Sequence, residues 1–276
     1  MMEIISTILN SFFGFFFFPF KTVDPFWGML FVSFVSGIVM LLIFKATSDQ
    51  AGIKTAKKKV RGHFLAIRLY RDDLGLMFGT VKSLFVSNVL YLKKAFRPML
   101  FLIIPVGIIL IHIAGRYEKR PLRVGETTVL SLKLNDNTGW EQLKKVEIDV
   151  PDGLKLETPP VRIAQLMEIS WRIGVEEQGE YWVTFKLADD VVKKKIHVTD
   201  ELLALDSKVT QSRFSTLLSS TDESSLPESG PFSAIEMSYP KREFDMLGFE
   251  LHWLLSFFLL SLISGFAFKR FLRVEF

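Results

Sequence analysis

The chain has 276 residues, a net charge of +4 and no cysteine, and 49% of its residues are hydrophobic, with 27 Phe among them. The lack of cysteine excludes disulfides, thiolate catalysis and cysteine-ligated zinc. The length is enough for roughly two domains. Because basic and acidic residues sort into separate segments, the small net charge does not indicate specific DNA binding.

The segment 1–24 predicts a hydrophobic helix that lies on a membrane surface. Residues 4–20 are mostly apolar, but Ser6 and Asn10 interrupt the run and Pro19 ends it. One early acidic residue and the lack of a small-residue cleavage pattern are atypical of a signal peptide. Such a segment fits an interfacial helix whose Phe side chains enter the acyl boundary. A fourth membrane span over residues 4–20 is the alternative.

Three further segments predict membrane spans. An apolar run of about 18 or more residues with few charges can cross the roughly 30 Å hydrocarbon core of a bilayer. Phe26 to Phe44 has no charged residue, and the other two runs carry at most one acidic residue, near one end. We therefore predict transmembrane spans at residues 25–45, 98–115 and 248–268.

The distribution of charge predicts how these spans are oriented. Lys45 to Arg97 contain 12 Lys or Arg and 3 Asp, a net charge of +9, and the tail 269–276 is also basic. Residues 116–250 contain 18 basic and 24 acidic residues, a net charge of −6. Loops rich in Lys and Arg stay in the cytoplasm. The sequence therefore predicts a multi-pass protein of the plasma (inner) membrane, with its N-terminus outside and its C-terminus in the cytoplasm.

The basic segment 46–97 predicts a cytoplasmic helical hairpin. Val60, Phe64 and Ile67 recur at helical spacing between basic residues, and Asp72–Asp73 marks a turn before the next apolar helical pattern. The charge of this segment suits anionic lipid headgroups or ribosomal RNA. The alternatives are a hairpin that lies on the membrane surface and an ordinary packed loop.

Residues 116–205 predict an extracytoplasmic, Ig-like β-sandwich. Short runs of alternating polarity, from TTVLSLKL to VVKKKIHV, are separated by turn residues with no helical pattern between most of them. Trp171, Trp182 and Tyr181 are expected to be core and edge aromatics, and carbohydrate or peptide binding is the alternative. The Ser-rich segment 206–247 is expected to be a linker to the last span.

No sequence motif indicates catalysis. The chain lacks the patterns of a P-loop, a dinucleotide-binding turn, a serine nucleophile elbow and a zinc protease helix. Its histidines share no metal-ligand spacing. The sequence thus predicts no enzyme, no cofactor and no metal. The histidines in question are His63, His112, His197 and His252.

Small and hydroxylated residues recur on one face of the first and last spans. They are Ser33, Ser36 and Gly37 in the first span, and Ser261 and Ser264 in the last, at steps of three and four. One interpretation is tight packing of the two spans, because small residues let helices approach closely and hydroxyls bond across the contact. The other is a mildly polar groove that receives a hydrophilic segment of another protein.

Residues 1–114 follow the order interfacial helix, span, basic helical hairpin, Pro-containing span. This order resembles the YidC/Oxa-type membrane-protein insertases, including the small relatives of archaea and of the endoplasmic-reticulum membrane complex. Two stretches carry the resemblance, MLFVSFVSGIVMLLIFKATSDQAGIKTAKKKVRGHFLAIRLYRDD and FRPMLFLIIPVGIILIHI. The first is similar to the first core helix of the family with its cytoplasmic hairpin, and the second to the helix that follows.

The resemblance implies a membrane-protein insertase or membrane chaperone that consumes no cofactor. Its groove would admit hydrophilic segments of client proteins and would be lined by the serines and glycine named above. Ser36 stands where bacterial relatives carry a groove Arg. The residues expected to recruit clients in the cytoplasm are Lys57, Lys58, Lys59, Arg61 and Arg97.

The main alternative is a non-catalytic scaffold subunit whose β-sandwich docks a partner complex in the envelope. A transporter subunit is disfavoured because no ionisable residue lies at mid-membrane in the predicted spans. The expected partners are membrane lipids, nascent or client membrane proteins, the ribosome through the basic hairpin, and an envelope protein through the β-sandwich.

Overall fold

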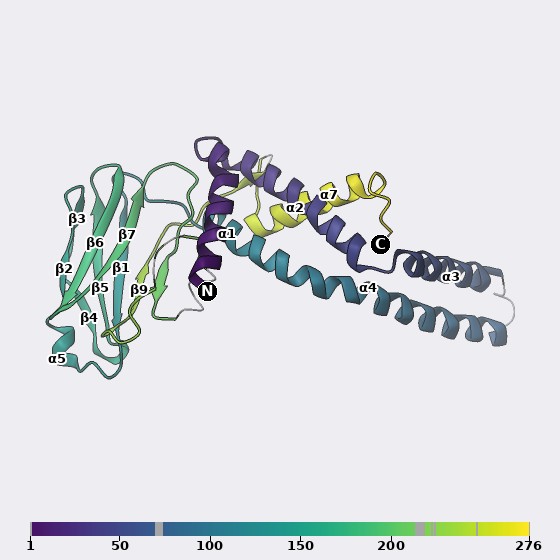
Figure 1. The fold of residues 1–276 in the computed structure, drawn as a ribbon, viewed down its shortest axis with the longest axis horizontal. Coiled ribbons are helices and arrows are strands. Elements are labelled where there is room, and N and C mark those ends of the chain that lie inside the picture. The colour runs from purple at the N-terminus through teal and green to yellow at the C-terminus, as the bar shows by residue number, and fades with distance from the viewer. Residues whose placement is uncertain are drawn as a thin grey trace. The chain divides into compact units, whose positions relative to one another are not determined.

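The computed structural model describes residues 2–69, 74–212, 219–221, 223, 225–246 and 248–275. The chain separates into two compact units, and each is described by itself (Figure 1). The first unit contains residues 1–28 and 111–253, and the second contains residues 29–110 and 254–276.

The long helices follow the apolar segments of the sequence. By length and composition alone, α2 and the part of α4 from Gly79 to Tyr117 could cross a membrane. Helix α7 is apolar but has only 17 residues, because Phe249–Glu250 form a short strand where the third span was expected to begin. The helices are α1 (Met2–Phe17), η1 (Phe18–Phe20), α2 (Pro25–Thr47), α3 (Gln50–Leu69), α4 (Leu74–Tyr117) and α7 (Trp253–Lys269).

Helix α4 joins two segments that the sequence analysis separated. The second arm of the expected hairpin and the expected span 98–115 form one continuous helix, with Pro98 and Pro105 inside it. Proline removes one backbone hydrogen bond and disfavours the helical conformation of the preceding residue, which is why a boundary was expected there. The boundary at residues 97 and 98 is therefore absent from the structure.

Side-chain caps explain where α2 and α3 begin. Asp24 Oδ1 accepts a hydrogen bond from the Phe26 backbone N–H at 2.8 Å, and Asp49 Oδ1 accepts one from the Gly52 N–H at 2.8 Å. Aspartate is a favoured N-cap because its carboxylate satisfies an N–H that has no partner within the helix. Pro25 at the first position of α2 loses nothing there, since its missing N–H would have been unpaired.

Helix α1 is amphipathic within the first unit. On one face, the ring of Phe13 stacks on His112 with centroids 4.1 Å apart, and Asn10 Nδ2 donates to the Thr221 carbonyl at 2.7 Å. On the other face, Phe12 and Phe15 are 59% and 82% exposed. A helix is confirmed at Met2–Phe17 within the predicted segment 1–24, and Pro19 lies in the short η1 turn that follows it, while the predicted place of this helix at a membrane surface stays a prediction.

Two antiparallel sheets form the β region of the first unit (Figure 1). One sheet has the order β3-β5-β1-β9-β8, with β4 also paired to β5, and the other has the order β2-β6-β7. A separate two-stranded ribbon joins β10 to β11. The strands of the first sheet are β1 (Thr127–Leu134), β3 (Leu154–Leu156), β4 (Val161–Ile163), β5 (Glu168–Val175), β8 (Lys208–Thr210) and β9 (Phe232–Met237). The remaining strands are β2 (Glu147–Asp149), β6 (Gly179–Leu187), β7 (Asp190–Val198), β10 (Asp245–Met246) and β11 (Phe249–Glu250), and short helical turns are α5 (Trp140–Leu143) and η2 (Ala164–Leu166).

One hydrophobic core lies between the two sheets. Trp171 of β5 and Phe185 of β6 bring their ring centroids to 5.5 Å, so the inner faces of both sheets meet there. Alternate residues of each strand point inward, which is the period expected of strands with one buried face. Each run of alternating polarity contains a strand, with Trp171 in the core and Trp182 half-exposed. These runs are TTVLSLKL, KKVEIDV, EISWRIGV, GEYWVTFKL and VVKKKIHV.

The sheet also recruits a strand from the segment expected to be a linker. Strand β9 pairs antiparallel with β1, with Leu132 opposite Ile235, and β8 pairs with β9. The expectation of a plain linker over 206–247 therefore differs from the structure at Lys208–Thr210 and Phe232–Met237. Strand β9 has only six residues and lies among Ser, Pro and Gly, so it is not evident from the sequence. Its partner, β1, is about a hundred residues earlier in the chain.

Two matched substitutions test this core. Val183→Ala should lower the free energy of unfolding by about 2 kcal/mol, because two buried methyl groups are lost from a side chain with no exposed surface. Val191→Ala removes the same atoms from a half-exposed position and should cost less than about 0.5 kcal/mol. Urea unfolding of the full chain, followed by tryptophan fluorescence, measures both. Equal losses of unfolding free energy in the two variants would contradict the burial of Val183 in this core.

Candidate functional site

In the second unit, α2 and α7 make a close contact built from small residues. A Cβ added to Gly37 would lie 2.5 Å from the Ser261 carbonyl oxygen and 3.0 Å from the Ser264 Cβ. Ser264 Oγ donates a hydrogen bond to the Phe34 carbonyl at 3.0 Å. The serines predicted for the client groove are brought to this helix pair and are all buried: Ser33, Ser36, Ser261 and Ser264.

The same two helices bury hydroxyl groups without partners. Neither Ser33 nor Ser256 has any exposed surface, and no described residue forms a hydrogen bond with either Oγ. Ser261 instead donates to the Phe258 carbonyl of its own helix at 3.1 Å. A buried polar group without a hydrogen bond costs about 1–3 kcal/mol. The helix pair is therefore tightly packed, yet its polar groups are incompletely satisfied.

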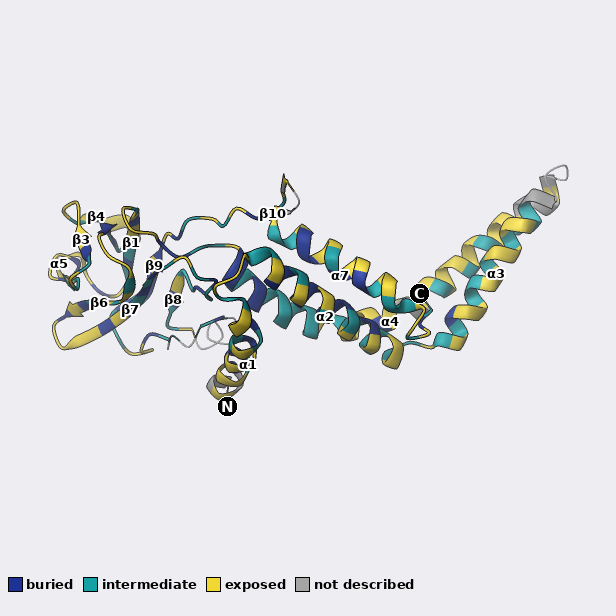
Figure 2. Cartoon of the chain, turned by 90° about the horizontal axis from the view of Figure 1, so that it is seen from above, coloured by how far each residue is buried: buried dark blue, intermediate teal, exposed yellow. Residues whose placement is uncertain are grey.

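Helices α3 and α4 lie antiparallel and side by side in two views (Figures 1 and 2). The two helical arms predicted from the sequence are confirmed by α3 and by the first part of α4. The turn predicted at Asp72–Asp73 lies outside the described residues. The arms thus bring the basic residues of the segment 46–97 onto one elongated hairpin.

The basic residues predicted to recruit clients have two different environments. Lys57 is half-buried, and its Nζ lies 3.2 Å from a Glu275 carboxylate oxygen. The ammonium of Lys57 lowers the pKa of the Glu275 carboxyl. The Glu275 backbone N–H also donates to Gln50 Oε1 at 2.7 Å, so the C-terminal tail packs against the start of α3. The other predicted recruitment residues are all exposed: Lys58, Lys59, Arg61 and Arg97.

The hairpin also exposes large apolar side chains. Phe64 on α3 is 61% exposed and Phe85 on α4 is 71% exposed. Helices that only pack against one another normally bury such residues in their contact. Clustered exposed apolar side chains indicate a surface that meets a membrane or another protein. The hairpin therefore exposes both apolar and basic residues, and much of α3 is coloured as exposed in Figure 2.

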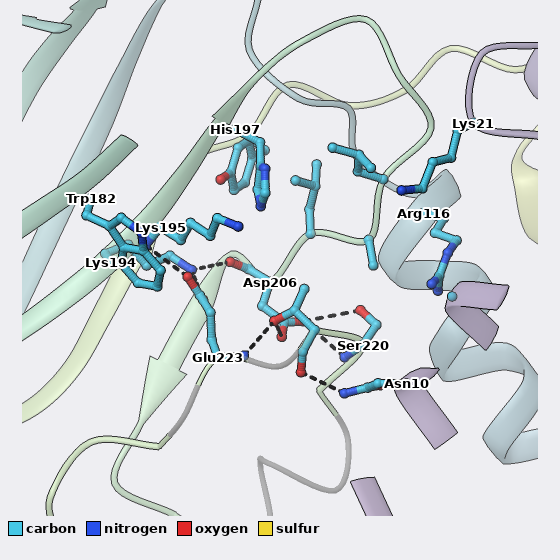
Figure 3. A pocket seen from close by; sticks show the side chains of 16 residues that line it. Asn10, Lys21, Arg116, Trp182, Lys194, Lys195, His197, Asp206, Ser220 and Glu223 are labelled. Atoms are coloured by element: carbon cyan, nitrogen blue, oxygen red, sulfur yellow. Dashed lines mark hydrogen bonds and ion pairs between the residues drawn. The ribbon is translucent and has the colours of Figure 1, made fainter. Parts of the chain in front are cut away.

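The first unit contains a cavity of about 380 Å³ that sequence analysis missed (Figure 3). Its lining comes from α1, the end of α4, strands β6 and β7, and the loop segments that follow β7. Four basic side chains and two carboxylates face it, a net charge of +2 with histidine neutral. The charged residues are Lys21, Arg116, Lys194, Lys195, Asp206 and Glu223.

A buried ion pair forms one wall of this cavity. The Lys194 side chain is 1% exposed, and its ammonium pairs with the Glu223 carboxylate. Lys194 Nζ also donates to the Asp206 carbonyl at 2.7 Å, and the Lys195 N–H donates to Glu223 Oε1 at 2.9 Å. Glu223 therefore neutralises Lys194 within the wall of the cavity.

His197 adds no positive charge to this cavity at neutral pH. Burial lowers the pKa of His197, and the charge of Lys195 lowers it further, against the opposing effect of Glu180 at 3.3 Å. Burial also raises the pKa of the nearby Tyr239 phenol, which stays protonated. The charge of the cavity at pH 7 thus depends on its lysines, Arg116 and the two carboxylates.

One sequence signal could have revealed part of this cavity. In VVKKKIHV, the strand alternation puts Lys194 on the same face as Val192 and Ile196, which are core residues. A lysine at an inward position requires a buried partner. Nothing in the sequence links Lys21 or Arg116 to that strand, because only the fold brings them to β7.

No protein-family model matches the chain, and no curated protein matches it. Across the residues that the structure describes, no group of three or more His, Asp or Glu side chains is arranged to hold a metal ion. The resemblance to YidC/Oxa-type insertases thus stays a prediction that rests on sequence pattern.

The α2–α7 contact can be tested at Gly37. Gly37→Ala places a methyl group 2.5 Å from a backbone oxygen, so the helices must separate. Because the chain has no cysteine, disulfide yield between cysteines introduced at Phe34 and Phe268, whose rings are 5.4 Å apart, reports the contact. We expect the yield to fall at least fivefold, at the lower end of the roughly 1–3 kcal/mol cost of overpacking.

The control is Gly107→Ala, where an added Cβ meets nothing within 4 Å. It should leave the disulfide yield unchanged. A similar yield in both variants would show that Gly37 is not held against α7.

The Lys194–Glu223 pair predicts a second result. Glu223→Gln should lower the free energy of unfolding by about 3 kcal/mol, because it leaves a buried ammonium without a counter-charge. Adding Lys194→Met should restore most of that loss, since the charge is then gone. Urea unfolding of the full chain measures all variants, with Glu147→Gln at an exposed position as the control. A loss no larger than that of the control would contradict the buried pair.

Proposed function

We propose that this protein is a membrane-protein insertase or membrane chaperone of the YidC/Oxa type. In this proposal α2, the apolar part of α4, and α7 span the plasma membrane, and α1 lies in its outer interface. The helical hairpin is cytoplasmic, and the Ig-like β-sandwich lies outside. The protein admits hydrophilic segments of client proteins and uses no cofactor.

The observation that carries the proposal is the exposed surface of the hairpin. Phe64, Phe85 and Phe96 are each more than half exposed, and Lys58 and Lys59 are exposed on the same hairpin. A nascent membrane segment is apolar and its flanks often carry charge, so a mixed surface of this kind can hold it before insertion. A hairpin that served only as a spacer would have no need to expose these side chains.

The α2–α7 helix pair supports a route for the hydrophilic part of a client. The contact is closed by Gly37 and by buried serines, and the hydroxyls of Ser33 and Ser256 have no hydrogen-bond partner among the described residues. In a bilayer, a polar client segment would supply those bonds if the two helices moved apart. The groove in this proposal is thus a contact that opens, and Ser33 and Ser36 line it.

The proposed membrane placement also agrees with α1. Its exposed face carries Ile4, Ile8, Phe12 and Phe15, and its other face packs inside the first unit. A helix with one packed face and one exposed apolar face fits the outer interface of a bilayer. A fourth span over residues 4–20 would have to expose the buried Asn10 to lipid.

One observation favours the scaffold as a second candidate. Val161 on β4 and Leu166 in the following turn are 58% and 57% exposed. Among the described strands β4 pairs with β5 alone, so it offers both a free edge and apolar side chains to a partner. In that case the spans anchor the sandwich, and Ser33→Leu leaves function unchanged.

Photocrosslinking in cells distinguishes the two candidates. A probe is placed at Ser33, at Ser36 or at Lys58, and the adducts are identified. An insertase yields adducts with short-lived nascent membrane proteins at all three positions. Adducts with one stable partner, or only with α7 of the same chain, would reject the insertase and favour the scaffold.

Charge reversal tests the role of the hairpin. Lys58→Glu with Lys59→Glu should reduce client insertion about tenfold, because two exposed cations that attract anionic lipid or RNA become repulsive. Lys57 is left unchanged, since it holds Glu275. The matched control is Lys144→Glu with Lys145→Glu, an adjacent exposed pair in the β-sandwich. If both double variants supported client insertion equally well, the hairpin would have no part in the proposed mechanism.

A further inference from the structure

We propose that the cavity lined by α1, the end of α4 and β7 binds a phosphate group, and that its source is the headgroup of an anionic phospholipid. The site lies entirely within the first unit (Figure 3). The phosphate chemistry follows from the charged groups in the lining. The lipid source rests on the membrane placement proposed above.

Arg116 is the central residue of the site. It is 5% exposed, and its guanidinium lies over the Phe17 ring, with Cζ 4.8 Å from the ring centroid. Nη1 donates to the His112 carbonyl at 3.0 Å, and no carboxylate of the described residues forms an ion pair with it. A guanidinium has five N–H donors, so several stay available toward the cavity. The Asp206 carboxylate in the same lining acts on Arg116 without forming an ion pair with it, so the buried charge is only partly offset. A bound anion lowers the remaining cost.

Lys21 supplies a second uncompensated charge. Its ammonium lies 5.4 Å from the Phe18 ring centroid and forms no ion pair with a described residue. The Lys21 carbonyl accepts a hydrogen bond from the Leu202 N–H at 2.9 Å, which fixes this residue beside the loop that follows β7. In Figure 3, Lys21 and Arg116 lie on the same side of the lining, and Lys195 extends from the opposite side.

The other charged groups in the lining are already partnered. Glu223 neutralises Lys194, and Lys195 lies 2.7 Å from a carboxylate oxygen of Glu180. The Asp206 carboxylate accepts hydrogen bonds from the hydroxyls of Ser219, Ser220 and Thr221. The Asp206 carboxylate oxygens are thus bonded to hydroxyls of a neighbouring loop segment. The site therefore offers the donors of Arg116 and Lys21 to an external anion.

The combination of an arginine and a lysine favours phosphate, which has more oxygens than a carboxylate. Arginine forms paired hydrogen bonds to phosphate oxygens, and a lysine adds a point charge to a third oxygen. Asn10 and Gly14 place the cavity against the inner side of α1, whose opposite side exposes apolar residues. If α1 lies in the interface, the cavity lies at the depth of the lipid phosphates, and the acyl chains extend along α1.

Binding can be measured on the delipidated full chain in an uncharged detergent. Intact mass spectrometry follows the titration of three probes: short-chain phosphatidylglycerol, a diacylglycerol with the same chains, and inorganic phosphate. We expect phosphatidylglycerol to bind and diacylglycerol not to bind. Lys21→Gln and Arg116→Lys should each weaken phosphatidylglycerol binding about tenfold, the effect of one lost charge-assisted hydrogen bond. Lys155→Gln, an exposed lysine of β3, should change nothing.

Each outcome decides the proposal. Equal phosphatidylglycerol binding by the unchanged protein, Lys21→Gln and Arg116→Lys would overturn it. If the protein bound inorganic phosphate and no phosphatidylglycerol, and the same two variants weakened that binding, the phosphate site would stand and the lipid source would be wrong. Lys21→Gln keeps the test valid should Arg116→Lys fail to fold. Because the assay measures no insertion, the phosphate site and the insertase can fail independently.

Discussion

The first unit depends on the packing around the last turn of α4. Tyr117 is fully buried, and its hydroxyl donates to the Pro25 carbonyl at 2.9 Å, while its ring contacts Phe17 and Phe244. One side chain therefore connects α1, the start of α2, and the segment that leads to α7. The Gly115 carbonyl accepts from the Leu205 N–H at 2.8 Å, so the loop after β7 is attached there too.

That packing needs a small residue beside Tyr117. A Cβ on Gly115 would lie 1.8 Å from Ser220 Oγ, a distance that no side chain tolerates. The approach of Ser220 holds the loop with Asp206 against the helix, and this loop forms part of the cavity next to Arg116. Because Gly115 lets Ser220 and its loop approach the end of α4, the cavity forms beside that helix end. Its charged side chains are buried as a consequence.

In the second unit, the contact between α2 and α7 has a different physical basis. In the proposed membrane placement, two apolar helices gain little from hydrophobic contact in lipid, so close approach and hydrogen bonds must hold them together. Gly37 permits the approach, and the Ser264 hydroxyl bonds to the Phe34 carbonyl. The hydroxyls of Ser33 and Ser256, which no described residue bonds, weaken the same contact. Close packing stabilises this contact and the two serine hydroxyls weaken it. The helices α2 and α7 are therefore suited to moving apart, which the proposed insertase requires.

The sequence by itself determined the local elements of this protein. Strands β1, β5, β6 and β7 alternate in polarity because one face is buried, and α2 carries no charged residue before Lys45 in its last turn, so period and composition identify them. The serines of α2 and α7 were also identified as one set, because helical spacing places them on one face. Whether they pack or receive a client was left open by spacing alone.

Only the tertiary structure decided which distant segments meet. Strand β9 is a short run among turn residues, and its place beside β1 depends on a partner that no local pattern specifies. Lys21, Arg116 and Asp206 share one cavity because α1, the end of α4 and the loop after β7 converge. Period and propensity describe neighbours along the chain, whereas long-range pairing is set by the packing of whole surfaces, and that information lies in no single segment.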